Sequence, residues 1–268
     1  MEITTWIVNA FAEGHFSGNQ AGVCILNSPI NEIAMLNIAK DLGFSETAFA
    51  VRTGKGNSFD LRWFTPGEEV DLCGHATLGA AFVIFELGLI EASRVDFETK
   101  SGLISVEIDN NGYLSLTLER EDPLSSNMDL GQVSEMLGVE VLELFETKRD
   151  LFAVVSDSSV LKSIKPDLDL IAALPFRAVV ATCGPSAGVS DYSLRLFGPK
   201  VSIPEDPATG SVQAVLGPFW KARLGKDVFG ATQMSQRGGK LRVNVVGDKV
   251  IVQGKVVTVM KGSIELKE

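Results

Sequence analysis

The chain has 268 residues, of which 45% are hydrophobic, and it carries a formal net charge of −10 at pH 7. This length suits one large domain or two small ones. The acidic balance, with no run of basic residues, predicts that neither nucleic acid nor an anionic membrane surface is a partner.

Cysteine and histidine usage sets further limits. The three cysteines form no CxxC pair, which predicts reduced thiols in a cytoplasmic protein rather than a disulfide framework or a zinc site. Only two histidines are present, so a histidine-rich metal site is excluded and we expect no metal. The first residues lack the basic and apolar regions of a signal peptide, and the apolar run at residues 72–85 is too short to span a bilayer.

Short strands and two helices are predicted in the first half of the chain. A helix at residues 31–42 ends at Gly43, and an apolar helix at residues 76–87 ends at Gly88, since glycine is the usual residue just past a helix. Strands are expected at residues 44–51, 103–108 and 113–118, and Asn110-Asn-Gly112 predicts a hairpin between the last two.

The second half repeats this order. Arg62-Trp-Phe64 recurs as Arg195-Leu-Phe197, and the polar loop after each motif leads into an apolar helix that ends at a glycine. The second set comprises a helix at residues 167–173, a helix at residues 208–224 before Gly225, and strands at residues 241–246, 249–252 and 256–260.

This repeat predicts an α+β fold made of two similar domains, each rich in antiparallel strands around one long helix. A helix that is apolar on nearly all sides should be enclosed rather than lie on a surface. We place the domains at residues 1–120 and 121–268, because residues 119–128 carry charge, proline and serine. The C-terminal strand either belongs to the second domain or packs back on the first.

The two apolar helices predict an anion site. Both helices begin within the segments at residues 74–77 and 206–211, where unpaired backbone N–H groups and the positive end of the helix dipole favour a carboxylate. Small residues there let a ligand approach the backbone, and Pro207 suits a first helical turn. The alternative is plain helix capping by Asp206 and Thr77.

Glu46 is the only ionisable residue on its face of the expected strand at residues 44–51, and the matching residue in the other half is Ala178. Apolar neighbours raise the pKa of a carboxyl group, which suits a group that takes and returns a proton. The alternative is a solvent-facing or structurally paired glutamate. His75, at the expected helix start, is either functional or a core histidine, and Cys73 is a candidate thiol base.

These segments together resemble the PhzF-like phenazine-biosynthesis family, and the resemblance covers essentially the whole chain. The segments that carry it are Ser17-Gly-Asn19, Ser45-Glu46-Thr47, Phe64-Thr-Pro66, Cys73-Gly-His75-Ala-Thr77-Leu-Gly79 and Glu205-Asp206-Pro-Ala-Thr209-Gly-Ser211. The resemblance implies a fold similar to diaminopimelate epimerase, with two pseudo-symmetric domains, each a mostly antiparallel sheet or barrel around a central helix, and an active site between them.

The resemblance also implies an activity. Family members of known chemistry are cofactor-independent isomerases that move a proton between carbons of a cyclic dihydro-hydroxyanthranilate, and they are commonly homodimers. By motif, the expected catalytic residues are Glu46, His75, Asp206 and Ser211. The residues expected to bind a small carboxylated substrate are Asn19, Gly74, Ala76, Thr209 and Gly210.

Two other functions remain open on the sequence. Cysteine before Gly-His is shared with the epimerase branch, so one alternative is an epimerase or racemase that uses Cys73. A second cysteine at the other helix start is absent, because Pro207 occupies the alignable place. The remaining alternative is a non-catalytic protein that binds small carboxylates.

Overall fold

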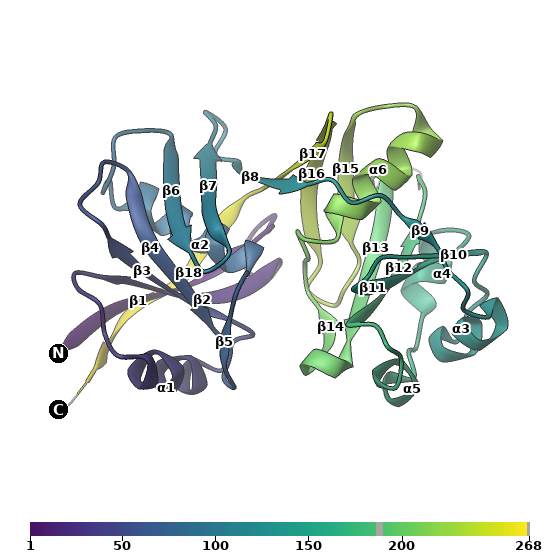
Figure 1. Cartoon of the computed structure of the whole chain (residues 1–268), viewed down its shortest axis with the longest axis horizontal. Helices are drawn as coiled ribbons and strands as arrows, with labels where there is room; N and C mark the ends of the chain where they lie inside the picture. Colours follow the sequence, from purple (N-terminus) through teal and green to yellow (C-terminus); the bar gives the residue numbers. More distant parts are fainter. Residues whose placement is uncertain (186–189, 267–268) are drawn as a thin grey trace. The chain divides into compact units, whose positions relative to one another are not determined.

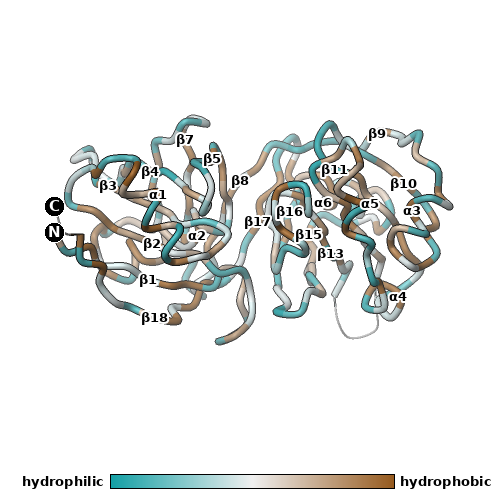
Figure 2. The backbone as a smooth tube through the Cα atoms, turned by 90° about the horizontal axis from the view of Figure 1, so that it is seen from below, coloured by the Kyte–Doolittle hydropathy of each residue, from teal (hydrophilic) through white to brown (hydrophobic). Residues whose placement is uncertain are grey.

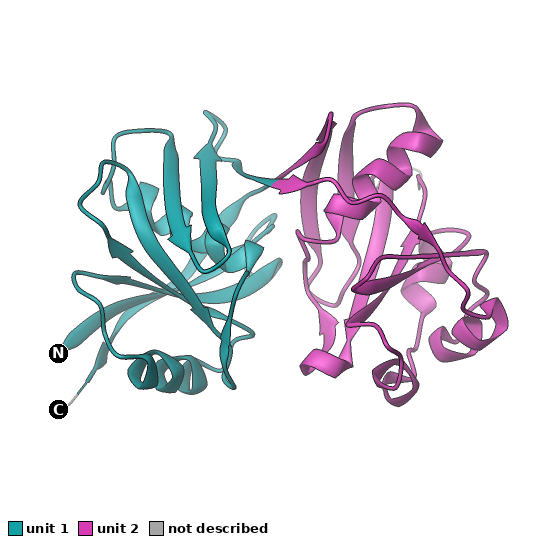
Figure 3. Cartoon of the chain, in the orientation of Figure 1, with its two compact units in different colours: residues 1–117, 253–268 teal, residues 118–252 magenta. Residues whose placement is uncertain are grey.

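The computed structural model describes residues 1–185 and 190–266, and contact density divides the chain into two compact units. The first unit is Met1–Thr117 with Gln253–Glu268, and the second is Leu118–Val252 (Figure 3). The C-terminal strand therefore belongs to the first unit. Within the described residues, no helix is both long enough and apolar enough to cross a membrane.

The first unit surrounds helix α2 with strands (Figure 1). Strand β8 runs across the boundary into the second unit, and β18 is the C-terminal strand that pairs with β1. Its elements are β1 (Glu2–Ala10), β2 (Asn19–Leu26), α1 (Glu32–Leu42), β3 (Thr47–Arg52), β4 (Ser58–Phe64), β5 (Glu69–Val70), α2 (Gly74–Glu86), β6 (Arg94–Thr99), β7 (Gly102–Ile108), β8 (Leu114–Glu119) and β18 (Val256–Glu265).

The second unit is built in the same way around helix α6. Two short helices, α4 and α5, take the place that α1 has in the first unit. Its elements are β9 (Leu124–Ser125), α3 (Leu130–Leu137), β10 (Glu143–Glu146), β11 (Asp150–Val154), α4 (Ser158–Ser163), α5 (Leu168–Ala172), β12 (Ala178–Cys183), β13 (Tyr192–Gly198), the 3-10 helix η1 (Pro199–Val201), β14 (Ile203–Asp206), α6 (Gln213–Leu224), β15 (Val228–Gln233), β16 (Gly239–Val246) and β17 (Lys249–Gly254).

Strand pairing follows one scheme in both units. In the first unit, β2 is parallel to β3, β3 antiparallel to β4, β4 parallel to β6, and β6 antiparallel to β7. In the second unit, β11, β12, β13, β15 and β16 repeat these four pairings in the same order and sense. The α+β class and the internal duplication predicted from the sequence are therefore confirmed.

The repeated Arg-x-Phe motif makes the same contacts in each unit. Its arginine donates two hydrogen bonds of 2.7–3.1 Å to a glutamate on the next strand. The guanidinium carbon lies 5.1 or 4.9 Å from the centroid of the phenylalanine ring two residues on, within cation–π range. The two sets are Arg62, Glu69 and Phe64, and Arg195, Glu205 and Phe197.

Each central helix approaches the sheet through a glycine. A Cβ atom at Gly79 in α2 would lie 2.7 Å from Cγ2 of Val8, and one at Gly217 in α6 would lie 3.0 Å from Cγ2 of Val245. Eight residues of each helix are buried and the exposed residues lie in the last turn, in keeping with their apolar sequences. In Figure 2 the hydrophobic colour lies mainly along the strands of each unit, and the connecting loops are mostly hydrophilic.

Three predicted boundaries are wrong. Strand β18 ends at Glu265, not at residue 260. Strand β3 begins at Thr47, not at residue 44, so Glu46 directly precedes the strand. Helix α6 begins at Gln213, not at residue 208, and Pro207 lies in the turn before it rather than in its first turn. This turn persists because Thr209 donates its backbone N–H to the side chain of Gln233 instead of entering the helix.

Candidate active site

The start of α2 carries Cys73 and His75. Cys73 is the N-cap residue, with extended backbone angles and no side-chain capping bond, and His75 is the second residue of the helix. Thr77 stabilises this end by donating from its hydroxyl group to the Cys73 carbonyl oxygen over 2.6 Å. The first backbone N–H groups of a helix have no partner within the helix, so this end offers donors to an anion.

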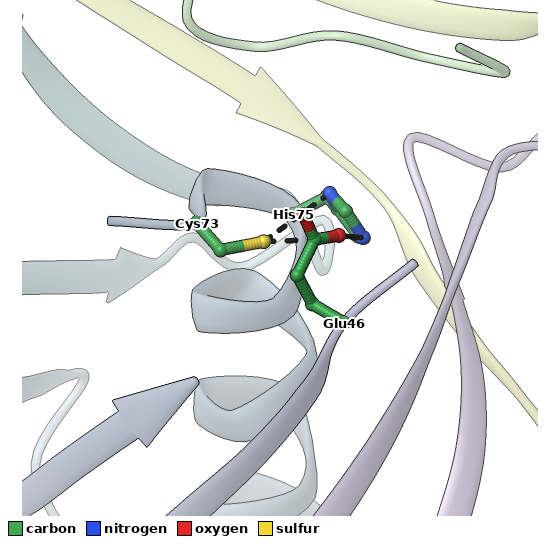
Figure 4. A group of neighbouring side chains, drawn as sticks. All are labelled: Glu46, Cys73 and His75. Carbon is green, nitrogen blue, oxygen red and sulfur yellow. Dashed lines mark hydrogen bonds and ion pairs between the residues drawn. The ribbon is translucent and has the colours of Figure 1, made fainter. Parts of the chain in front are cut away.

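Glu46 approaches His75 from the connection between α1 and β3. Its carbonyl oxygen accepts a hydrogen bond of 3.2 Å from the Gly22 backbone, which fixes Glu46 beside β2 just before β3 begins. Its Oε2 atom lies 3.4 Å from Nε2 of His75 (Figure 4). The two side chains are 15% and 10% exposed, and this Oε2 atom is buried without a hydrogen bond. A carboxylate oxygen with unused lone pairs therefore faces the imidazole.

The other ring nitrogen of His75 has two neighbours. The side-chain amide nitrogen of Asn19, the first residue of β2, lies 3.4 Å from Nδ1, and the sulfur of Cys73 lies 3.5 Å from the same atom. Asn19 is only 2% exposed, so it can restrain the ring. Ala76 is fully buried, so only its backbone is available to a ligand.

The second unit holds the other expected site residues in one turn. Asp206 ends β14, and Thr209, Gly210 and Ser211 follow before α6 begins. The Thr209 hydroxyl group donates a short hydrogen bond to Oδ2 of Asp206, and both residues are buried. The backbone N–H of Gln213 donates 3.1 Å to the Gly210 carbonyl oxygen, so Gly210 and Ser211 lie against the helix start.

Two buried glutamines that we did not predict hold this turn. Gln233 accepts from the Thr209 N–H over 2.7 Å and donates to the Asp206 carbonyl oxygen over 2.6 Å. Gln213 donates to the Thr209 carbonyl oxygen over 3.0 Å and accepts from the Tyr192 hydroxyl group over 2.6 Å. Burial raises the pKa of Tyr192, which keeps this hydroxyl group a donor. Gln213, a polar residue directly before the apolar run at residues 214–220, is the one available sequence signal.

The structure thus brings Asn19, Glu46, Cys73, Gly74 and His75 together in the first unit. It gathers Asp206, Thr209, Gly210 and Ser211 in one turn of the second. A basic imidazole, a carboxylate and a thiol in contact form an arrangement suited to proton transfer.

Comparison with known proteins identifies the family. The family model PhzC-PhzF, described as "Phenazine biosynthesis-like protein", matches residues 8–262. The chain belongs to this family. The PhzF-like resemblance of the sequence motifs is therefore confirmed.

Among its relatives, an uncharacterized isomerase of Halalkalibacterium halodurans is 34% identical over 267 residues, covering 99% of this chain and 100% of the relative. A solved PhzF family protein from Enterococcus faecalis is 37% identical, with a TM-score of 0.94 over 99% of this chain and 100% of that one. The chain is an isomerase of the PhzC-PhzF family.

A more distant likeness concerns the fold alone. A structure described as a predicted epimerase from Pseudomonas aeruginosa is 21% identical and has a TM-score of 0.77 over 99% of this chain and 100% of that one. The PhzC-PhzF fold is thus shared with epimerase-like proteins, as expected from the resemblance to diaminopimelate epimerase.

Proposed function

We propose that the protein is a cofactor-independent isomerase that moves a proton between two carbons of a small carboxylated substrate, with Glu46 as the general acid/base. The observation that carries this proposal is the 3.4 Å approach of Glu46 Oε2 to His75 Nε2, with that oxygen otherwise lacking a hydrogen bond. An oxygen without a donor is available to take a proton from carbon.

The proposed reaction has three steps. The substrate carboxylate accepts hydrogen bonds from the backbone at the start of α2, where Gly74 adds no side chain to obstruct it. Glu46 then removes a proton from a carbon activated by conjugation, and the imidazole of His75 stabilises the charge that develops. The protonated Glu46 returns the proton to a second carbon, so no net change in oxidation state occurs.

Residues of the second unit complete the proposed catalytic group. Asp206 and Ser211 orient the substrate, and the Gly210 backbone and Thr209 take part in binding it. The support for their role is the buried hydrogen-bonding that holds this turn in place. A homodimer and a cytoplasmic location belong to the same proposal; three cysteines without a CxxC pair are in keeping with a reducing compartment.

A screen in heavy water tests the reaction class. Small carboxylic acids with a conjugated or α-acidic carbon are incubated with the protein in D₂O and analysed by mass spectrometry. We expect a gain of one deuterium in at least one acid, together with a positional isomer of it. Isomer formation without deuterium uptake would instead indicate that the transferred proton does not exchange with solvent, or that a hydride shift occurs. No turnover of any conjugated acid would contradict the proposal.

A second candidate is an epimerase that uses Cys73. The observation in its favour is the 3.5 Å distance between the Cys73 sulfur and His75 Nδ1 at a helix start, a position in which a thiolate is stabilised. Cys73→Ala separates the two candidates. Retained turnover excludes the thiol mechanism, whereas parallel loss of activity on substitution and on alkylation with iodoacetamide favours it.

A further inference from the structure

Glu46, Cys73 and His75 bring together three different kinds of metal-binding atom. One carboxylate oxygen, one thiol sulfur and one imidazole nitrogen all lie within 4.8 Å of one another (Figure 4). Nε2 of His75 is 3.4 Å from Oε2 of Glu46 and 4.0 Å from the Cys73 sulfur. Sequence spacing did not predict this set, because Glu46 reaches the other two only through the fold.

The spacing is close to that of a tetrahedral site. Zinc bond lengths to sulfur, nitrogen and oxygen give edges of about 3.3–3.6 Å between neighbouring ligand atoms. The nitrogen–oxygen edge already has this length. The sulfur–nitrogen edge is 4.0 Å and the sulfur–oxygen edge is within 4.8 Å, so these two edges are longer than ideal by about 0.5 Å and by at most about 1.3 Å. Rotations of the Cys73 and Glu46 side chains would shorten both edges.

Charge and burial also favour a cation here. Oε2 of Glu46 is buried without a hydrogen bond, a costly condition that a bound cation relieves. A carboxylate and a thiolate together neutralise a divalent ion. The side chains of His75 and Glu46 stay 10% and 15% exposed, so the cluster is not fully sealed from solvent.

Asn19 supplies an outer contact of the kind that orients metal-binding histidines. Its side-chain amide lies 3.4 Å from Nδ1 of His75. The two ends of an amide are assigned from the hydrogen-bond network, and when the amide is turned by 180° its oxygen accepts a hydrogen bond from the Nδ1–H group of His75. That tautomer leaves the Nε2 lone pair for a cation beside Glu46.

We propose that Glu46, Cys73 and His75 bind one thiophilic divalent cation of the Zn²⁺ class, and that this cation inhibits the isomerase reversibly. The thiol ligand selects Zn²⁺ and Co²⁺ over Mg²⁺ and Ca²⁺, which prefer oxygen ligands only. Binding displaces the thiol proton into the buffer. Inhibition rests on the proposed function, because it requires that Glu46 carry the proton; the binding itself does not.

Cobalt titration of the full chain tests the site without measuring activity. We expect one Co²⁺ per chain, a near-ultraviolet sulfur-to-cobalt charge-transfer band, and loss of that band on addition of Zn²⁺. Cys73→Ser should abolish the band and weaken binding at least about 100-fold, since changes outside the ligand shell alone cost 10–100-fold. Cys24→Ala should keep it, because burial raises the pKa of the Cys24 thiol to about 12.

Three results overturn the proposal. The first is the absence of the band in the wild-type protein, and the second is its retention in Cys73→Ser. The third is unchanged Co²⁺ affinity in both His75→Ala and Glu46→Gln, each checked for folding by circular dichroism. Failure of the proposed isomerase chemistry has a different signature, in which Co²⁺ binds as expected while no carboxylic acid exchanges deuterium.

Discussion

His75 Nε2 lies 3.4 Å from Glu46 Oε2, although one residue lies in the first turn of helix α2 and the other precedes strand β3. The contact depends on the parallel pairing of β2 with β3, because the Gly22 backbone of β2 holds the Glu46 carbonyl group. A carboxylate and an imidazole placed in this way can pass a single proton between them.

Removing the side-chain amide of Gln233 should destabilise the second unit. Gln233→Met leaves the Thr209 N–H and the Asp206 carbonyl group buried without their partner, which we expect to lower the free energy of unfolding by about 2–4 kcal/mol. Urea unfolding measures the change. The matched control is Gln132→Met at an exposed helical position, with an expected change below about 0.5 kcal/mol. Equal effects of the two substitutions would show that the network is energetically unimportant.

Stability should depend on pH through Glu69. Hydrogen bonds from Arg62 lower the pKa of this carboxyl group from its ordinary 4.5 to about 2. A lowered folded-state pKa stabilises the protein above pH 4.5, and the contribution is lost as the pH falls from 4.5 towards 2. Glu69→Gln should therefore lower the free energy of unfolding by about 1–3 kcal/mol at pH 7, and its difference from wild type should vanish near pH 2.

The control for Glu69 is its neighbour Glu68, whose side chain is exposed. Glu68→Gln should differ little from wild type between pH 7 and pH 2. Thermal unfolding followed across this pH range gives both comparisons. A Glu69→Gln curve that runs parallel to wild type at every pH would contradict the assigned role of Arg62.

Adding one methyl group at Gly79 should strain the first unit. A Cβ atom there would lie 2.7 Å from Val8 Cγ2, so Gly79→Ala should lower the free energy of unfolding by about 1–3 kcal/mol. Val8→Ala makes room for the new methyl group. The double variant should then be more stable than the sum of the two single changes predicts. Strict additivity would mean that helix α2 is not held against β1 at this point.

The duplicated architecture could be predicted because its signals are local and repeated. Arg62 and Arg195 occupy matching positions in the two halves. Each is followed two residues later by a phenylalanine and pairs with a glutamate on the next strand. Glycine after each helix marked its end well, since Gly43 and Gly225 both adopt left-handed angles.

The starts of β3 and α6 could not be predicted in this way. The alternating side-chain pattern extends through Phe44 and Ser45, but these two residues form a bend rather than part of the strand. Pro207 suggested a helix start, but the glutamine contacts of Thr209, made across the second unit, hold a turn there instead. Gln233 was missed because nothing in its strand distinguishes a buried amide from a solvent-facing one.

The role of Glu46 is tested most directly by proton exchange with solvent. With a substrate found in the heavy-water screen, the rate of deuterium incorporation is measured for wild type, Glu46→Gln and Glu46→Asp, alongside substrate binding. We predict at least about a 100-fold loss of incorporation in Glu46→Gln, partial activity in Glu46→Asp and near-normal binding in both. Incorporation by Glu46→Gln at the wild-type rate would show that another residue carries the proton.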